Sequence, residues 1–233
     1  MKSATSSDSS KKKKLVVGKK KYSLPKFNTS TDAKVSLRRG MLKLLGTTDP
    51  KILDAYGGPG ELWKLAYDET PNYVGVDKRL YLDGRTMVKG DNTRFLRAID
   101  LESFDVFDLD AFGSPFESLA IISHRFKWKE KDRIAVFLTE GTGFNAAMNG
   151  LSRDLLTYIG VSPHKKTMFQ IRERHALVRM AIAKMAEDMG GQIEHFRIFV
   201  REKLGPQDML YIGYILTRNP VIGDHDATIT VPK

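Results

Sequence analysis

Apolar strand-like segments alternate with helical or loop stretches along most of this chain, and that alternation limits the possible fold more than any single motif. Seven segments have the length and composition of β-strands: 51–55, 73–76, 87–89, 106–110, 134–139, 192–200 and 209–217. Only residues 201–208 separate the last two, too few for a crossover helix, so this pair is expected to form an antiparallel hairpin. The prediction is an α/β domain with a seven-stranded, mostly parallel sheet that ends in this hairpin.

Helical periodicity is clearest in three stretches outside these strands. One begins at Thr31 and ends near Gly46, a second covers residues 151–158, and a longer one runs from about Thr167 to Met189. The inward positions of the longest are Ile171, Val178, Ile182 and Met185.

The net charge of +10 is concentrated at the amino terminus. Residues 1–30 hold nine Lys and one Asp, so they carry eight of the ten net positive charges. Because residues 1–30 contain few apolar side chains, they are predicted to be a disordered Lys-rich arm. Residues 31–220 are predicted to form a single domain and 221–233 a tail. A cationic arm adds salt-sensitive affinity for a polyanion, which indicates a nucleic-acid partner. A solubilising tail and a nuclear-import patch are the alternatives.

Composition excludes several classes of site. The chain has no Cys, so disulfides, thiolate zinc sites and iron–sulfur clusters are ruled out. Its five His residues lack metal-ligand spacing, so no metal is expected.

No apolar run has the length of a membrane span, and the first residues do not resemble a signal peptide. We expect no membrane association and a cytoplasmic location, or a nuclear one if the organism is eukaryotic. The sequence does not indicate an oligomeric state.

A glycine-rich turn follows the first predicted strand, in the segment Ile-Leu-Asp-Ala-Tyr-Gly-Gly-Pro-Gly at residues 52–60. A buried strand that ends in Asp54, followed by Gly58 and Gly60 and then a helix start, lets a ligand approach backbone N–H groups. A dinucleotide fingerprint requires a third glycine where Trp63 stands, which argues against pyrophosphate binding. A plain tight turn is the alternative reading.

Acidic residues follow the next two strands. Asp77 ends the second strand, where a carboxylate can accept hydrogen bonds from both hydroxyls of a ribose. Asp91 follows the third, where it can accept one from an adenine amino group. Each acid alone is also explained as a helix cap.

Together these residues resemble the first three motifs of class I S-adenosylmethionine-dependent methyltransferases, over roughly residues 50–220. The resemblance implies the Rossmann-like fold of that class and S-adenosylmethionine as cofactor. It places the backbone of Gly58 and Gly60 under the methionine part, Asp77 at the ribose and Asp91 at the adenine, with Asp54 completing the motif. Tyr56 stands where the family has its first glycine.

The fourth strand delivers a carboxylate followed by an aromatic ring. Asp110 can accept an N–H bond from an exocyclic amine and so increase its nucleophilicity, while Phe112 can stack on a base. Alternatively, the segment is a strand end with solvated acids, or Asp108 and Asp110 are the metal-binding pair of a nucleotide-sugar glycosyltransferase.

The same segment is similar to the Asp-Pro-Phe-Gly-Ser-Pro motif of the tRNA guanine-N2 dimethyltransferase family. The matching residues are Asp110, Phe112, Gly113, Ser114 and Pro115, and Ala111 replaces the family's first proline. This resemblance implies amino methylation, with Asp110 and Phe112 catalytic and the residues 113–115 beside the substrate.

The sequence therefore predicts an S-adenosylmethionine-dependent methyltransferase that acts on an exocyclic amine of a nucleic-acid base, with RNA preferred over DNA. A DNA amino-methyltransferase, a protein methyltransferase and a non-catalytic nucleic-acid-binding module with the same fold are the alternatives. Two further candidates for substrate contact are the loop residues Phe144 and Asn145. Those for phosphate contact, unless they form a solvated helix face, are His164, Lys165, Lys166, Arg172, Arg174, His175 and Arg179.

Overall fold

The computed structural model describes residues 15–17, 20–22, 31–141, 150–162, 172–201 and 209–220. The chain divides into two compact units, Met1–Ser30 and Thr31–Lys233. In the first unit, β1 (Leu15–Val17) and β2 (Lys20–Tyr22) pair antiparallel. This pairing was not expected from the sequence, in which residues 1–30 read as a disordered arm.

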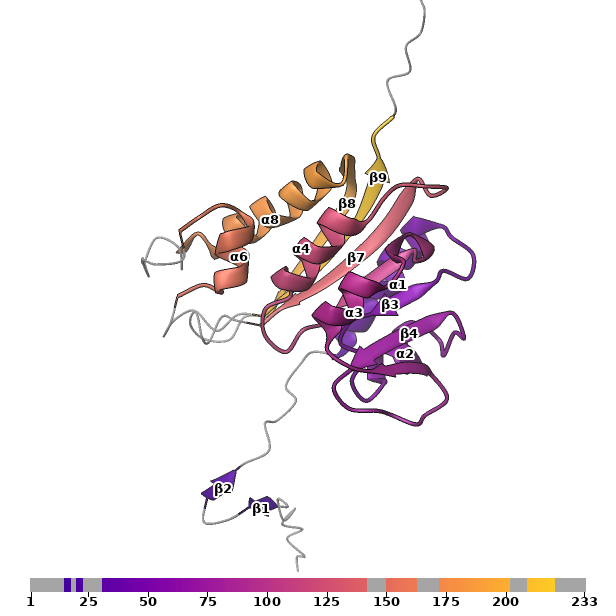
Figure 1. Ribbon diagram of the computed structural model, residues 1–233, viewed down its shortest axis with the longest axis vertical. Coiled ribbons are helices and arrows are strands. Elements are labelled where there is room, and N and C mark those ends of the chain that lie inside the picture. Colours follow the sequence, from indigo (N-terminus) through magenta and orange to yellow (C-terminus); the bar gives the residue numbers. More distant parts are fainter. Residues whose placement is uncertain are drawn as a thin grey trace, which may run out of the picture. The chain divides into compact units, whose positions relative to one another are not determined.

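The second unit is built on one seven-stranded sheet (Figure 1). Its strands are β3 (Ile52–Asp54), β4 (Tyr73–Asp77), β5 (Thr86–Lys89), β6 (Val106–Leu109), β7 (Arg133–Glu140), β8 (Gly191–Arg201) and β9 (Met209–Arg218). Each of the seven predicted strands is present, with bounds shifted by no more than one residue.

The strand order is β5-β4-β3-β6-β7-β9-β8. The first five strands of this order pair in parallel, and β9 pairs antiparallel with both β7 and β8. The predicted hairpin is therefore confirmed, with its second strand inserted between β7 and β8. This is the strand order of the Rossmann-like class I methyltransferase fold, so the expected fold class is confirmed as well.

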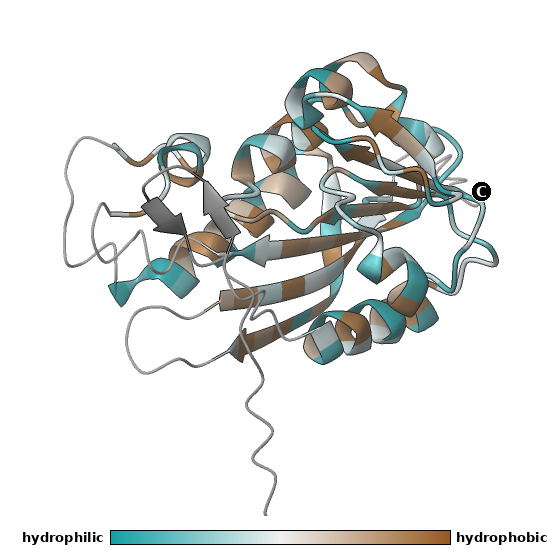
Figure 2. Ribbon diagram, turned by 90° about the horizontal axis from the view of Figure 1, so that it is seen from below, coloured by the Kyte–Doolittle hydropathy of each residue, from teal (hydrophilic) through white to brown (hydrophobic). Residues whose placement is uncertain are grey.

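Helices cover both faces of the sheet. On one face lie α1 (Thr31–Leu45) and α2 (Glu61–Ala66), and on the other lie α3 (Asn92–Ala98), α4 (Phe116–Arg125), α6 (Arg153–Tyr158) and α8 (Arg174–Asp188), with a short 3₁₀ turn at Leu101–Ser103. Strand β7 shows why both faces are covered, because Val136 packs into one apolar cluster and its neighbour Phe137 into the other. Figure 2 shows apolar residues along the strands, as this arrangement requires.

The helices agree with the periodicity of the sequence where the structure describes them. Helix α1 begins at Thr31 as predicted, and Val178, Ile182 and Met185 of α8 are buried. Ile171 lies outside the described residues. Among the described helices, none is long and apolar enough to cross a membrane.

Candidate active site

A cavity of about 450 Å³ opens at the carboxyl ends of β3, β4, β5 and β6. It is lined by Ala55, Tyr56, Val76, Asp77, Lys78, Gly90, Asp91, Asn92, Thr93, Ala111, Phe112, Gly113, Ser114, Glu117 and Asp154. In an open α/β sheet, ligands bind where the strand order reverses direction, here between β3 and β6. A second hollow, of about 740 Å³, lies around Arg133 and Arg218 at the other edge of the sheet, where β7 begins and β9 ends. None of the predicted site residues lines it.

The glycine-rich turn adopts backbone conformations that favour glycine. Gly58 has φ +42° and Gly60 has φ +82°, both in the left-handed region. The N–H of Gly58 donates to Asp77 Oδ2 at 3.2 Å, so the turn contacts a residue of the cavity wall. Neither glycine lines the cavity itself.

Asp77 and Asp91 both line the cavity, as the strand-end argument predicted. The second oxygen of Asp77, Oδ1, accepts the N–H of Arg79 at 2.8 Å. Asp91 is also the N-cap of α3, because its Oδ1 accepts from the Thr93 hydroxyl at 2.7 Å and from the Arg94 N–H at 3.0 Å. These bonds to Thr93 and Arg94 lower the pKa of Asp91. Asp91 therefore caps α3 and lines the cavity at the same time.

Asp54 does not reach the cavity. Its side chain is buried, with 2% of the residue exposed, and it accepts the Tyr73 hydroxyl at 2.6 Å and the Tyr56 N–H at 2.9 Å. Burial, together with the nearby Asp108 charge, raises the pKa of Asp54 to about 7. Asp54 therefore shapes the turn from inside the protein and has no direct access to a ligand.

Tyr56, which stands in place of the family's first glycine, forms part of the cavity wall. Its hydroxyl lies 3.0 Å from Ser118 Oγ on α4. Burial raises the pKa of this phenol, so it remains neutral at physiological pH. Tyr56 therefore adds a hydrogen-bonded ring to the cavity wall.

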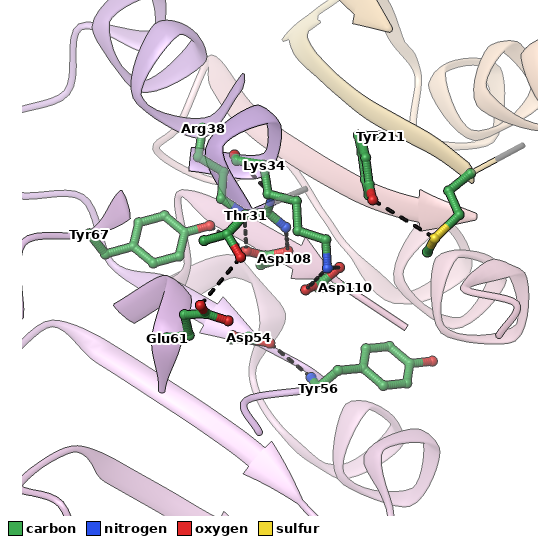
Figure 3. A network of polar contacts seen from close by, with 11 residues as sticks. Thr31, Lys34, Arg38, Asp54, Tyr56, Glu61, Tyr67, Asp108, Asp110 and Tyr211 are labelled. Carbon is green, nitrogen blue, oxygen red and sulfur yellow. Dashed lines mark hydrogen bonds and ion pairs between the residues drawn. The ribbon is translucent and has the colours of Figure 1, made fainter. Parts of the chain in front are cut away.

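Two basic residues of α1 neutralise the acids at the end of β6 (Figure 3). Lys34 Nζ lies 2.7 Å from the Asp110 carboxylate, and Arg38 donates two hydrogen bonds of 2.6 Å to the Asp108 carboxylate. The Tyr67 hydroxyl also donates to Asp108, at 2.5 Å. Although burial opposes ionisation of Asp110, the Arg38 and Lys34 cations hold its pKa below the usual value.

Asp110, the predicted catalytic acid, therefore faces α1 and does not line the cavity. Its side chain is 15% exposed. This geometry does not support the alternative interpretation of Asp108 and Asp110 as a metal-binding pair, because Arg38 and Lys34 already balance the charges of the two carboxylates. Across the residues that the structure describes, no cluster of three potential metal ligands occurs.

The aromatic segment after β6 does reach the cavity. Phe112 is 85% exposed and lines the cavity mouth beside Gly113 and Ser114. Pro115 is buried as the N-cap residue of α4 and takes no part in the wall. Of the four residues that the sequence predicted beside the substrate, Phe112, Gly113 and Ser114 therefore line the cavity and Pro115 does not.

Glu117 and Asp154 also line the cavity, and sequence reasoning missed both. Asp154 accepts the Ser114 hydroxyl and, at 3.2 Å, the N–H of Glu117. The sequence could have indicated Glu117, because it stands in the first turn of α4, two residues after Pro115. The approach of α6 to α4 that delivers Asp154 has no local signal in the sequence. With Asp77 and Asp91, they bring four carboxylates to the cavity, and among the lining residues that the structure describes Lys78 is the only basic one.

Four of the residues predicted for phosphate contact, Arg172, Arg174, His175 and Arg179, lie in α8 or just before it. Arg174 is buried and ion-paired with Glu140, which corrects its assignment to phosphate contact. Arg179 lies over the Phe196 ring, 4.7 Å from its centroid. Arg172 and His175 are exposed. The remaining candidates lie outside the described residues: Phe144, Asn145, His164, Lys165 and Lys166.

Comparisons with known proteins give matches only among solved structures. No family model matches the sequence, and no curated protein matches it. TYW2 of M. jannaschii in complex with AdoMet shares 11% identity, with 84% of this chain and 80% of that one covered and a TM-score of 0.47.

Two further structures match at a similar level. Magnesium protoporphyrin IX methyltransferase of Synechocystis PCC 6803 with bound SAM shares 12% identity over 81% of this chain and 79% of its own, with a TM-score of 0.45. A putative hemolysin from Streptococcus thermophilus shares 12% over 85% and 70%, with a TM-score of 0.48. The fold assignment depends on the strand order of this chain and not on these likenesses.

Proposed function

We propose that this chain is an S-adenosylmethionine-dependent methyltransferase that modifies an exocyclic amine of a nucleic-acid base, with RNA preferred over DNA. The observation that carries the proposal is the acidic cavity at the carboxyl ends of β3 to β6, whose wall includes Asp77 and Asp91. Asp77 and Asp91 were expected at a nucleoside-binding site from their positions after two successive strands.

The cavity suits this cofactor in size and charge. A volume of about 450 Å³ is within the usual range for small-molecule sites. S-adenosylmethionine is a net cation at neutral pH, and the described lining residues, with four carboxylates and Lys78, carry a net negative charge that favours a cation. Asp77 would accept the ribose hydroxyls, since backbone N–H groups hold both its oxygens in place, and Asp91 would accept the adenine amino group. When bound, the cofactor supplies an electrophilic methyl group.

The acceptor would be held by Phe112 and Asp110. The exposed Phe112 ring offers a stacking surface for a base at the mouth of the cavity. Asp110, kept ionised by the nearby cations, would accept an N–H bond from the exocyclic amine. Because its pKa is low, Asp110 is a poor proton acceptor, so the proton of the methylated amine would leave to solvent.

One observation favours a second candidate, a non-catalytic nucleic-acid-binding module. Lys34 holds the Asp110 carboxylate, and Asp110 lies outside the cavity wall. In that case the Lys-rich arm would supply the affinity for nucleic acid and no methyl transfer would occur.

Incubation with methyl-labelled S-adenosylmethionine separates these candidates. The purified chain is mixed with separate pools of RNA, DNA and protein, alongside Asp110→Asn and the matched control Asp68→Asn, whose carboxylate pairs with Arg39 on the surface. Label in RNA supports the proposal if Asp68→Asn preserves it and Asp110→Asn abolishes it at a temperature where circular dichroism shows the Asp110→Asn variant to be folded. Label in DNA alone or in protein alone would contradict the RNA preference and would make that polymer the substrate class. Cofactor binding without label in any pool supports the module, and no cofactor binding overturns the proposal.

A further inference from the structure

Arg85 packs against the glycine-rich turn from the side opposite Asp77. Its side chain is 0% exposed, and it donates to the Gly57 carbonyl at 2.7 Å and to the Gly58 carbonyl at 2.9 Å. Asp83 accepts two further bonds from the guanidinium, at 2.8 Å and 2.6 Å. The guanidinium thus joins the turn to an acid of its own loop with all three nitrogens engaged.

Aromatic rings and a glycine complete the surroundings of this guanidinium. Its central carbon lies 5.8 Å from the ring centroids of Trp63, Tyr73 and Tyr81, within cation–π range. A Cβ atom on Gly60 would lie 2.7 Å from Arg85 Cζ, so any larger residue there would displace the guanidinium. The position of Arg85 is therefore fixed from several directions.

One peptide group connects Arg85 to the cavity. In a trans peptide, the C=O and the following N–H point in opposite directions. The peptide between Gly57 and Gly58 has its C=O on Arg85 Nη1 and its N–H on Asp77 Oδ2, at 2.7 Å and 3.2 Å. This one peptide group is therefore hydrogen-bonded to Arg85 on one side and to Asp77 on the other. Asp77 in turn lines the cavity.

We propose that Arg85 is a positioning residue for the cofactor site. It sets the orientation of the Gly57–Gly58 peptide, and that peptide orients the Asp77 carboxylate toward the ribose. Residues 78–84 join Asp77 to Arg85, so the two ends of one loop act on the same peptide group. Arg85 does not line the cavity and acts only through its neighbours. The inference rests on the proposed cofactor.

The test compares Arg85→Met and Arg85→Lys with Arg133→Met. Arg133 is a matched control, because it also donates to two backbone carbonyls, of Leu44 and Leu45, and pairs with Glu194, but at the amino end of β7 and away from the cavity. Calorimetry measures the Kd of S-adenosylmethionine and of adenosine, and thermal unfolding measures stability.

Arg85→Met is expected to raise both Kd values at least tenfold, and Arg85→Lys to give a smaller increase because it retains only one donor group. Arg133→Met is expected to lower the thermal midpoint while leaving both Kd values within twofold. Kd values for Arg85→Met within twofold of wild type, with a lowered midpoint, would overturn the inference. If Arg85→Met fails to fold, Arg85→Lys decides by the same criteria.

Hydrogen exchange provides a readout that needs no cofactor. The backbone amides of residues 56, 57, 58 and 60 are expected to exchange faster in Arg85→Met than in wild type, and Arg133→Met is expected to leave them unchanged. If the wild type binds neither ligand, the proposed function fails and exchange alone decides. Unchanged exchange of the amides of residues 56, 57, 58 and 60 would then overturn the role of Arg85.

Discussion

Lys34 Nζ lies 2.7 Å from the carboxylate of Asp110, and this contact joins the first helix of the second unit to the end of its central strand β6. Both side chains are largely buried, and each charge offsets the desolvation cost of the other. Arg38 and Asp108 repeat the arrangement one turn further along α1. Helix α1 is therefore held to the sheet by charge as well as by its apolar residues.

Breaking the Lys34–Asp110 pair should destabilise the fold. Lys34→Gln and Asp110→Asn are each expected to lower the free energy of unfolding by about 3 kcal/mol, because each leaves a buried partner uncompensated. The double variant should cost less than the two single changes together. Urea unfolding measures all three. Arg39→Gln, which breaks the exposed pair with Asp68, should change stability by less than about 1 kcal/mol and serves as the control.

Asp54 should make stability depend on pH. Its pKa rises from an ordinary 3.8 to about 7 in the folded protein, so between these values the folded state retains a proton that the unfolded state has lost. Stability should therefore fall as pH rises from about 4 to 7 and level off above. Asp54→Asn removes this dependence and should be more stable than wild type at pH 8, by up to about 4 kcal/mol. Thermal midpoints from pH 5 to 8 measure it. A wild-type midpoint that rises over this range by as much as the variant's contradicts the assignment.

Gly60→Ala should cost more stability than Gly84→Ala. Both glycines have positive φ, +82° and +90°, so both changes carry the backbone penalty of about 1 kcal/mol. Only at Gly60 does the new methyl group meet another group, the guanidinium of Arg85, whereas nothing lies within 4 Å at Gly84. Adding Arg85→Met to Gly60→Ala should recover part of the difference. Equal losses at the two glycines, measured by urea unfolding, would show that Arg85 moves aside freely.

The acidic wall should favour a sulfonium over a thioether. Glu117→Gln and Asp154→Asn are each expected to weaken S-adenosylmethionine binding about two- to tenfold, and S-adenosylhomocysteine binding less, because the latter lacks the sulfonium charge. Calorimetric Kd values for both ligands give the ratio. Glu69→Gln, on an exposed residue outside the cavity wall, is the control. An equal loss for both ligands would mean that the two acids act through shape and not through charge.

The sequence predicted those parts of the site that follow from position along a strand. Asp77 and Asp91 lie after successive parallel strands, and parallel strands deliver such residues to one edge of the sheet. Asp54 was misplaced because a strand-end acid can turn inward as well as outward, and here Tyr73 offers it a buried partner. Periodicity along one strand does not settle that choice.

Residues placed by contact between distant elements could not be predicted. Lys34 meets Asp110 across 76 positions of sequence, and Asp154 meets Ser114 across 40. Arg85 sits in a loop whose composition gave no sign of its path under the glycine turn. Such contacts depend on how helices and loops pack on the sheet, which no local pattern encodes.

The position of β9 between β7 and β8 also bears on the order in which the protein can assemble during synthesis. Strand β9 leaves the ribosome after both of its neighbours, so neither the outer edge of β7 nor strand β8 can find its native partner until that late segment emerges. The nascent chain must meanwhile keep two unpaired strand edges from associating with other molecules. A ribosome stalled before residue 209 would therefore hold a domain whose candidate site is largely translated but whose sheet is still open.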